Sequence, residues 1–97
     1  MQPIRKTWEL SEIIQKVIGQ TAEAFERPPE TISPQTKFLA DLAAESIDFV
    51  DLTFRIERVF GIKIPEGEFF DNDPGRRPVS IQDVADYVAE KLKEPVK

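Results

Sequence analysis

Three stretches of the chain place apolar residues three and four positions apart, the spacing that gathers side chains on one face of an α-helix. They predict helices at about residues 8–25, 46–60 and 80–93, and a single short helical turn is expected at 66–71. No stretch shows the apolar–polar alternation typical of a strand. The sequence therefore predicts an all-α fold, a four-helix bundle with a short third helix.

The ends of these helices carry start and stop signals. Thr7 is the expected N-cap of the first helix, and Gly61 is expected to end the second, because glycine readily adopts the left-handed conformation found after a helix. Ser80 should cap the last helix. Asp83, three residues later, would complete a capping box with aspartate in the place of the usual glutamate or glutamine.

A long connection, residues 27–44, joins the first two helices, because the proline pair that begins at Pro28 stops the first one. Loops beyond about 12–15 residues with no structure of their own are uncommon in compact domains. We therefore expect this one to be pinned to the core by Ile32, Phe38 and Leu42. A connection of this length would also permit the two helices to run in similar directions.

Composition excludes several classes of function. A chain of 97 residues has room for one domain, residues 1–97. It contains no cysteine, which excludes disulfides and thiolate sites, and no histidine, which removes the commonest general base and metal ligand. We expect no catalytic residues and no resident metal. The net charge is −5 without a clustered basic face, so nucleic acid is not an expected partner. No signal sequence or membrane span is recognised, and a cytoplasmic location is expected.

The second predicted helix has two apolar sides when it is projected at 100° per residue. One is an ordinary core face, made of Phe49, Leu52, Ile56, Val59 and Phe60. The other, roughly opposite, is a stripe made of Ile47, Val50 and Phe54, with Asp48, Asp51 and Glu57 around it. A helix in a small bundle needs only one buried face, so this stripe is either covered by another segment or presented to a partner.

Ser46 stands between acidic residues where the long connection gives way to this helix. Serine is a preferred N-cap, so its hydroxyl could simply cap the helix. A helix N-terminus also has unpaired N–H groups and favours negative charge, so a phosphate ester on this hydroxyl would be stabilised. Position alone does not separate these two interpretations.

Three blocks of the sequence resemble the acyl carrier proteins. The family signature Asp-Leu-Gly-Ala-Asp-Ser-Leu-Asp is matched by Asp41-Leu42-Ala43-Ala44-Glu45-Ser46-Ile47-Asp48. The segments after the family's second helix and in its last helix are similar to Phe60-Gly61-Ile62-Lys63-Ile64-Pro65 and Ile81-Gln82-Asp83-Val84-Ala85-Asp86-Tyr87-Val88. The chain departs from the signature at Ala43, Glu45 and Ile47. Residues 66–78 are longer than the usual third-helix region, which suggests a specialised member of the family.

The resemblance implies a cofactor and a role. A phosphopantetheinyl transferase would move 4′-phosphopantetheine from coenzyme A onto Ser46 with the help of magnesium, and the thiol of this arm would carry acyl groups as thioesters. The chain would then be a monomeric carrier without catalytic activity, serving fatty-acid, polyketide or related biosynthesis. A peptidyl, aminoacyl or D-alanyl carrier remains open, as does an unmodified helical interaction module.

The resemblance also implies a docking surface on the second helix for basic patches of partner enzymes. Its expected residues are Glu45, Ile47, Asp48, Val50, Asp51, Phe54 and Glu57. Arg55 and Arg58 depart from the more uniformly acidic helix of the family, so some general partners are expected to be refused.

Overall fold

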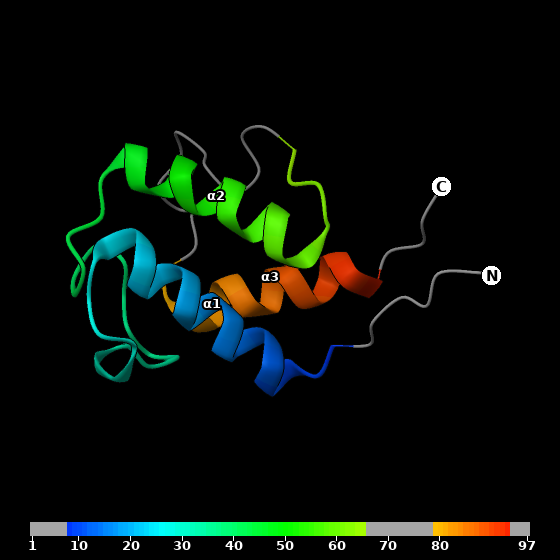
Figure 1. Cartoon of the computed structure of the whole chain (residues 1–97), viewed down its shortest axis with the longest axis horizontal. Coiled ribbons are helices and arrows are strands. Elements are labelled where there is room, and N and C mark those ends of the chain that lie inside the picture. Colours follow the sequence, from blue (N-terminus) through cyan, green and yellow to red (C-terminus); the bar gives the residue numbers. More distant parts are fainter. Residues whose placement is uncertain (1–7, 66–78, 94–97) are drawn as a thin grey trace.

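The computed structural model describes residues 8–65 and 79–93, which form an all-helical fold (Figure 1). Its helices are α1 (Leu10–Phe25), the 3₁₀ turn η1 (Pro29–Thr31), α2 (Ser46–Phe60) and α3 (Ile81–Lys93). The described residues contain no β-strand, only an isolated bridge between Lys37 and Ser80. The all-α prediction is confirmed for these residues. The short helix predicted at residues 66–71 lies outside them.

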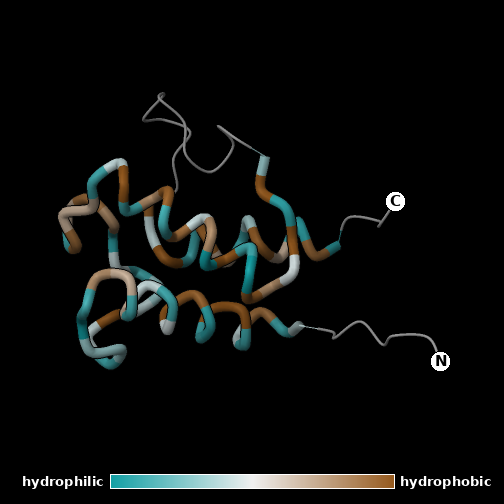
Figure 2. The backbone as a smooth tube through the Cα atoms, turned by 45° about the horizontal axis from the view of Figure 1, so that its top comes forward, coloured by the Kyte–Doolittle hydropathy of each residue, from teal (hydrophilic) through white to brown (hydrophobic). Residues whose placement is uncertain are grey.

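α1 packs against both of the other long helices. α1 and α2 run in opposite directions, and α3 runs in the same direction as α2 (Figure 1). The long connection would have permitted α1 and α2 to run in similar directions, but the fold does not use this freedom. Apolar segments of α1 lie on its side facing the other helices, and hydrophilic segments lie on the outside (Figure 2).

The core draws on every long helix and on the connection between α1 and α2. Its residues that are at most 1% exposed are Val17, Phe38, Phe49, Leu52, Ile56, Ile81, Val84, Ala85 and Val88. Phe38 of the connection lies against Phe49 of α2, with ring centroids 5.6 Å apart. Trp8, just before α1, meets the ring of Phe60 edge-on at 4.9 Å. Four residues of the core face predicted for α2 are buried, and the fifth, Val59, is half-buried against the core.

α1 ends at Phe25, as the sequence predicts, but its N-cap differs from the prediction. Its N-cap is Glu9, which has an extended backbone and whose N–H donates to the Glu12 carboxylate at 3.1 Å, so the prediction of Thr7 was wrong. At the other end Glu26 adopts the left-handed conformation, with φ of 54°. The N–H groups of Glu26 and Arg27 donate to the carbonyls of Glu23 and Ala22, which is the Schellman pattern.

The long connection is fastened to the core as predicted. Ile32, Phe38 and Leu42 are all buried. The connection also bonds to the start of α3: the N–H of Ile81 donates to the carbonyl of Thr36 at 3.1 Å, and the N–H of Gln82 donates to the carbonyl of Pro34 at 2.9 Å. These bonds pair backbone donors that an α-helix leaves without intrahelical partners in its first turn. The connection thus supplies the acceptors for the first backbone N–H groups of α3.

Candidate functional site at the start of α2

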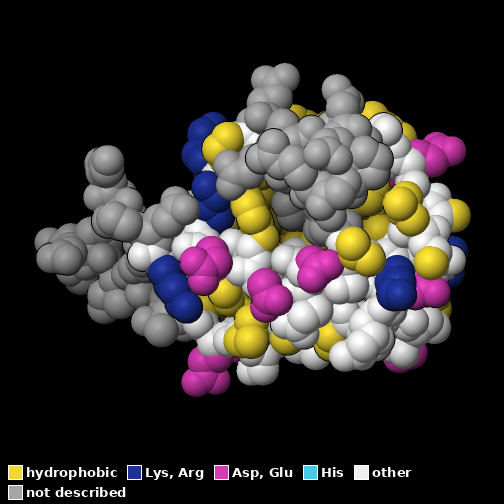
Figure 3. Space-filling model, turned by 180° about the vertical axis from the view of Figure 1, so that it is seen from behind, with side chains coloured by type: hydrophobic (Ala, Val, Ile, Leu, Met, Phe, Trp, Pro, Cys, Tyr) yellow, Lys and Arg dark blue, Asp and Glu magenta, His cyan; other side chains and the backbone are white. Residues whose placement is uncertain are grey.

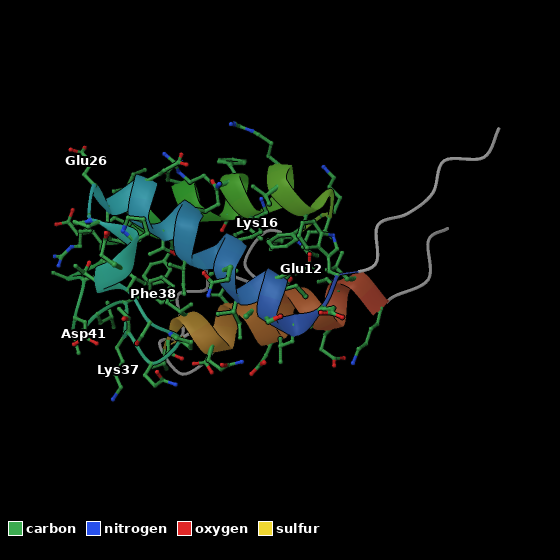
Figure 4. All side chains as sticks on the ribbon, turned by 60° about the horizontal axis from the view of Figure 1, so that its bottom comes forward. Glu12, Lys16, Glu26, Lys37, Phe38 and Asp41 are labelled. Atoms are coloured by element: carbon green, nitrogen blue, oxygen red, sulfur yellow. The ribbon has the colours of Figure 1, made fainter. Side chains whose placement is uncertain are left out.

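A compact turn at residues 37–44 leads into α2. The Asp41 carboxylate accepts the N–H of Lys37 at 2.8 Å, and the N–H of Asp41 donates back to the Lys37 carbonyl at 2.9 Å (Figure 4). The N–H of Ala44 then donates to the Phe38 carbonyl at 2.9 Å. Since Phe38 is buried in the core, this turn sets where α2 begins.

Ala43 takes a left-handed conformation inside this turn, with φ of 52°. Its own side chain is exposed, while Leu42 and Ala44 on either side are buried. A Cβ atom is disfavoured in this conformation and glycine is not. The signature that the sequence resembles has glycine at this position, and the left-handed backbone conformation explains this preference. This chain keeps the same conformation with alanine.

The cap of α2 is Glu45, not Ser46. Glu45 has an extended backbone, with φ of −107° and ψ of 171°, and its N–H donates to the Asp48 carboxylate at 2.7 Å. Ser46 is the first helical residue, and its side chain is exposed. The hydroxyl of Ser46 has no hydrogen-bond partner among the described residues. The interpretation of Ser46 as a cap was therefore wrong.

The N-termini of α2 and α3 differ in how their backbone donors are used. Residues of the long connection accept the first N–H groups of α3, as described above. Within residues 8–65 and 79–93, nothing accepts the N–H groups of Ser46 and Ile47. These two donors point out of the helix beside an exposed hydroxyl, an arrangement that stabilises a phosphate group. The residues present therefore fit a phosphate ester on Ser46.

The second apolar stripe of α2 lies on the surface. Ile47 is 66% exposed and Phe54 is 61% exposed, while Val50 is half-buried. The stripe therefore does not contribute to the core as Phe49 or Leu52 do. Isolated apolar side chains on a surface are ordinary, but here two large ones lie on one helix next to a candidate modification site.

Each acidic residue predicted around the stripe has an intramolecular partner. Asp48 accepts the N–H of the cap residue, and Glu57 accepts the N–H of Ile64 at 2.8 Å. Asp51 accepts the Nε–H of Arg55 at 3.1 Å. Glu57 thus fastens the segment that follows α2 back onto the helix, a role that the sequence did not indicate because the two residues are seven positions apart.

Arg55 also reaches a second helix. One of its terminal nitrogens lies 3.3 Å from a carboxylate oxygen of Glu23 on α1, so its guanidinium joins acids from α1 and α2. The spacing of Asp51 and Arg55 by four residues could have predicted the first ion pair. Nothing local could have predicted the second, since Glu23 and Arg55 are 32 positions apart.

Acidic side chains are also prominent elsewhere on the molecule. On the side seen in Figure 3 several of them lie in a row across the middle and others lie at the edges, while Lys and Arg side chains lie nearer the edges. Exposed acids of α3 include Asp83, Asp86 and Glu90. This distribution agrees with the net charge of −5. The described helices include none long and apolar enough to cross a membrane.

Comparison with known proteins identifies the family. Residues 10–74 match the family model described as "Phosphopantetheine attachment site". The chain is 34% identical over 82 residues to an acyl carrier protein of Thermosynechococcus vestitus, covering 84% of this chain and 94% of that protein. It is 41% identical over 56 residues to the acyl carrier protein AcpXL of Brucella melitensis, covering 58% and 60% of the two chains. With AcpXL of Rhizobium meliloti the identity is 46% over 50 residues, or 52% and 53%.

The chain therefore belongs to the phosphopantetheine-binding carriers and, among them, to the acyl carrier protein family. Its cofactor is covalently attached 4′-phosphopantetheine. Proteins of this family are carriers rather than catalysts.

Proposed function

We propose that Ser46 is the residue that carries 4′-phosphopantetheine, and that the chain presents acyl groups on this arm to biosynthetic enzymes. One observation carries the proposal: Ser46 is exposed at the first position of α2, and neither its hydroxyl nor the N–H groups of Ser46 and Ile47 have partners among the described residues. The arm supplies the thiol that this chain lacks.

The contribution of the chain is to hold and orient the attachment point. The turn between Lys37 and Ala44 anchors the start of α2 to buried Phe38, and Glu45 with Asp48 defines the first helical turn. The helix dipole places partial positive charge at Ser46, which favours the negative phosphate of the modified residue. A phosphopantetheinyl transferase is the partner that would install the group from coenzyme A.

We propose that the outer face of α2 is the docking surface for this transferase and for acyl-transferring or synthase enzymes. Ile47, Val50 and Phe54 would supply apolar contact close to the arm, and the nearby acids Glu45, Asp48, Asp51 and Glu57 would steer basic patches toward it. A small apolar stripe with charges around it suits a complex that must form quickly and dissociate again. Pathway and cargo are proposed only as fatty-acid, polyketide or related biosynthesis.

We also propose a domain organisation, an oligomeric state and a location for the chain. Residues 1–97 would form one domain, with the predicted short helix at 66–71 completing a four-helix bundle. The carrier would act as a monomer without catalytic activity of its own, in the cytoplasm. The longer segment at residues 66–78 and the matches to two AcpXL proteins support a specialised member of the family.

Intact mass spectrometry tests the attachment site. The protein would be incubated with coenzyme A, magnesium and a broad-specificity phosphopantetheinyl transferase, and it should gain the mass of one phosphopantetheine group. Ser46→Ala should abolish the gain. Ser11→Ala is the matched control, because Ser11 is also an exposed serine in the first turn of a helix. No gain with several transferases, or a gain that survives Ser46→Ala, would refute the proposal.

A further inference from the structure

A straight row of side chains runs along the outside of α2. Ile47, Asp51, Phe54 and Arg58 follow the spacing i, i+4, i+7 and i+11, which keeps them on one side of a helix. Ile47, Phe54 and Arg58 are exposed, and Asp51 is half-buried. Arg58 therefore lies one turn beyond the exposed aromatic ring of Phe54, on the surface that the proposed function assigns to docking.

The two arginines of α2 are in different electrostatic situations. Arg55 contacts the carboxylates of Asp51 and Glu23, and its side chain is only 27% exposed. Arg58 is exposed and makes no ion pair or hydrogen bond through its side chain with any residue in the described ranges. The positive charge of Arg55 is thus compensated by acids of the same chain, whereas the positive charge of Arg58 is available to a docking partner.

Hydrogen bonds hold the acids of the same surface in place, and these acids keep their negative charge. Asp48, Asp51 and Glu57 each accept a hydrogen bond from within the chain. Glu45 is exposed at the start of α2, and Arg58 is exposed near its end. The surface therefore carries an exposed acid beside Ser46 and, near its other end, the positive charge of Arg58, which has no partner among the described residues; the exposed side chains of Ile47 and Phe54 lie between them.

We infer that Arg58 is a specificity-determining residue of the docking surface, and that the partner it fits is an enzyme with a carboxylate placed against it. This rests on the proposed function of α2 as the docking surface. Such a partner has an apolar recess for Phe54, a basic group toward the Ser46 end and an acidic residue at the far end. A partner whose docking patch is basic throughout meets repulsion at Arg58 and associates more slowly.

A structural role for Arg58 makes a different prediction. Arg58 lies in the last turn of α2, where a cation interacts favourably with the helix dipole. If this were its only role, Arg58→Glu would lower thermal stability and leave association with partners unchanged. Unfolding curves of every variant below, followed by circular dichroism, separate the two roles.

The first experiment uses a transferase with a basic docking patch as the probe and measures kcat/KM for modification of the carrier. Arg58→Glu should raise kcat/KM about three- to tenfold, because it removes one repulsive contact and adds an attractive one, each typical of an exposed pair. Lys16→Glu is the matched control: it makes the same charge change at an exposed residue of α1 (Figure 4). An equal rise in both variants would show a net-charge effect and overturn the inference.

The second experiment is a charge swap. Each basic residue of the transferase's docking patch is replaced singly by glutamate, and each variant is paired with the native carrier and with Arg58→Glu. At one position, glutamate should raise kcat/KM for the native carrier and lower it for Arg58→Glu, a coupling that a double-mutant cycle measures. Absence of any such position overturns the inference. If no carrier is modified at all, including the native one, the proposed function itself has failed.

Discussion

The left-handed conformation of Ala43 predicts an unusual substitution, one that stabilises the protein by removing a methyl group. With φ of 52°, the Cβ of Ala43 lies close to its own backbone, at a cost of roughly 1–2 kcal/mol. Glycine at this position avoids the cost but gives the unfolded chain more freedom, which lowers stability by about 0.4–1 kcal/mol. Ala43→Gly should therefore stabilise the protein by a few tenths to about 1 kcal/mol.

A matched control isolates the strain. Ala40 is also exposed and lies in the same connection, but its φ is not positive. Ala40→Gly gains the same freedom in the unfolded chain and relieves no strain, so it should destabilise by about 0.4–1 kcal/mol. The difference between the two variants is then the strain alone, about 1–2 kcal/mol.

Thermal unfolding followed by circular dichroism at 222 nm measures this difference. For a domain of this size, 1 kcal/mol shifts Tm by about 4–8 °C. Ala43→Gly should thus unfold between about 4 and 16 °C above Ala40→Gly, and above the native protein. If both variants unfold below the native protein by the same amount, the left-handed strain at Ala43 is absent and the reasoning is wrong.

Three further predictions concern α2. Phe54→Ala should change the free energy of unfolding by no more than about 0.5 kcal/mol, because the ring is exposed, whereas Phe49→Ala should lower it by about 3–5 kcal/mol. Urea unfolding measures both values, and equal losses would show that Phe54 is a core residue. Glu57→Ala should lower the free energy of unfolding by about 1–3 kcal/mol, because it leaves the Ile64 N–H unpaired. Glu57→Gln should recover most of this loss, because an amide oxygen also accepts a hydrogen bond. If both variants weaken docking equally, the charge of Glu57 matters for docking beyond its structural role. Association of the carrier with a basic partner should weaken as the salt concentration rises, because salt screens the attraction between charges. Values of kcat/KM at low and at physiological ionic strength measure this effect. A value that does not change with salt would contradict steering by the acids of α2.

Much of the fold could be read from short-range sequence patterns. The faces of the helices follow from apolar spacing, and the residues predicted to pin the connection, Ile32, Phe38 and Leu42, are buried. The capping box at Ser80 and Asp83 is present as predicted, with the Ser80 N–H donating to the Asp83 carboxylate at 3.1 Å. Gly61 ends α2 in the left-handed conformation. The helix faces, the capping box and the end of α2 at Gly61 involve residues at most four positions apart, so the local sequence is sufficient to specify them.

The start of α2 shows where local patterns mislead. Ser46 and Thr7 are both of the type preferred at N-caps, yet Glu45 and Glu9 occupy the caps. Cap preferences amount to about 1 kcal/mol, and burial of Leu42, Ala44 and Phe49 around the start of α2 decides the register of the chain there. The shift by one residue leaves the Ser46 hydroxyl exposed and without a capping role.

The sequence by itself determined the helical faces, the local stop signals, the exclusion of cysteine and histidine chemistry, and the family signature around Ser46. Only the tertiary structure decided which exposed groups have partners. It pairs Gln82 with Pro34 and Arg55 with Glu23, and leaves the donors of Ser46 unpaired among the described residues. These contacts join residues distant in the chain, so they depend on how the helices pack and are not specified by any local pattern.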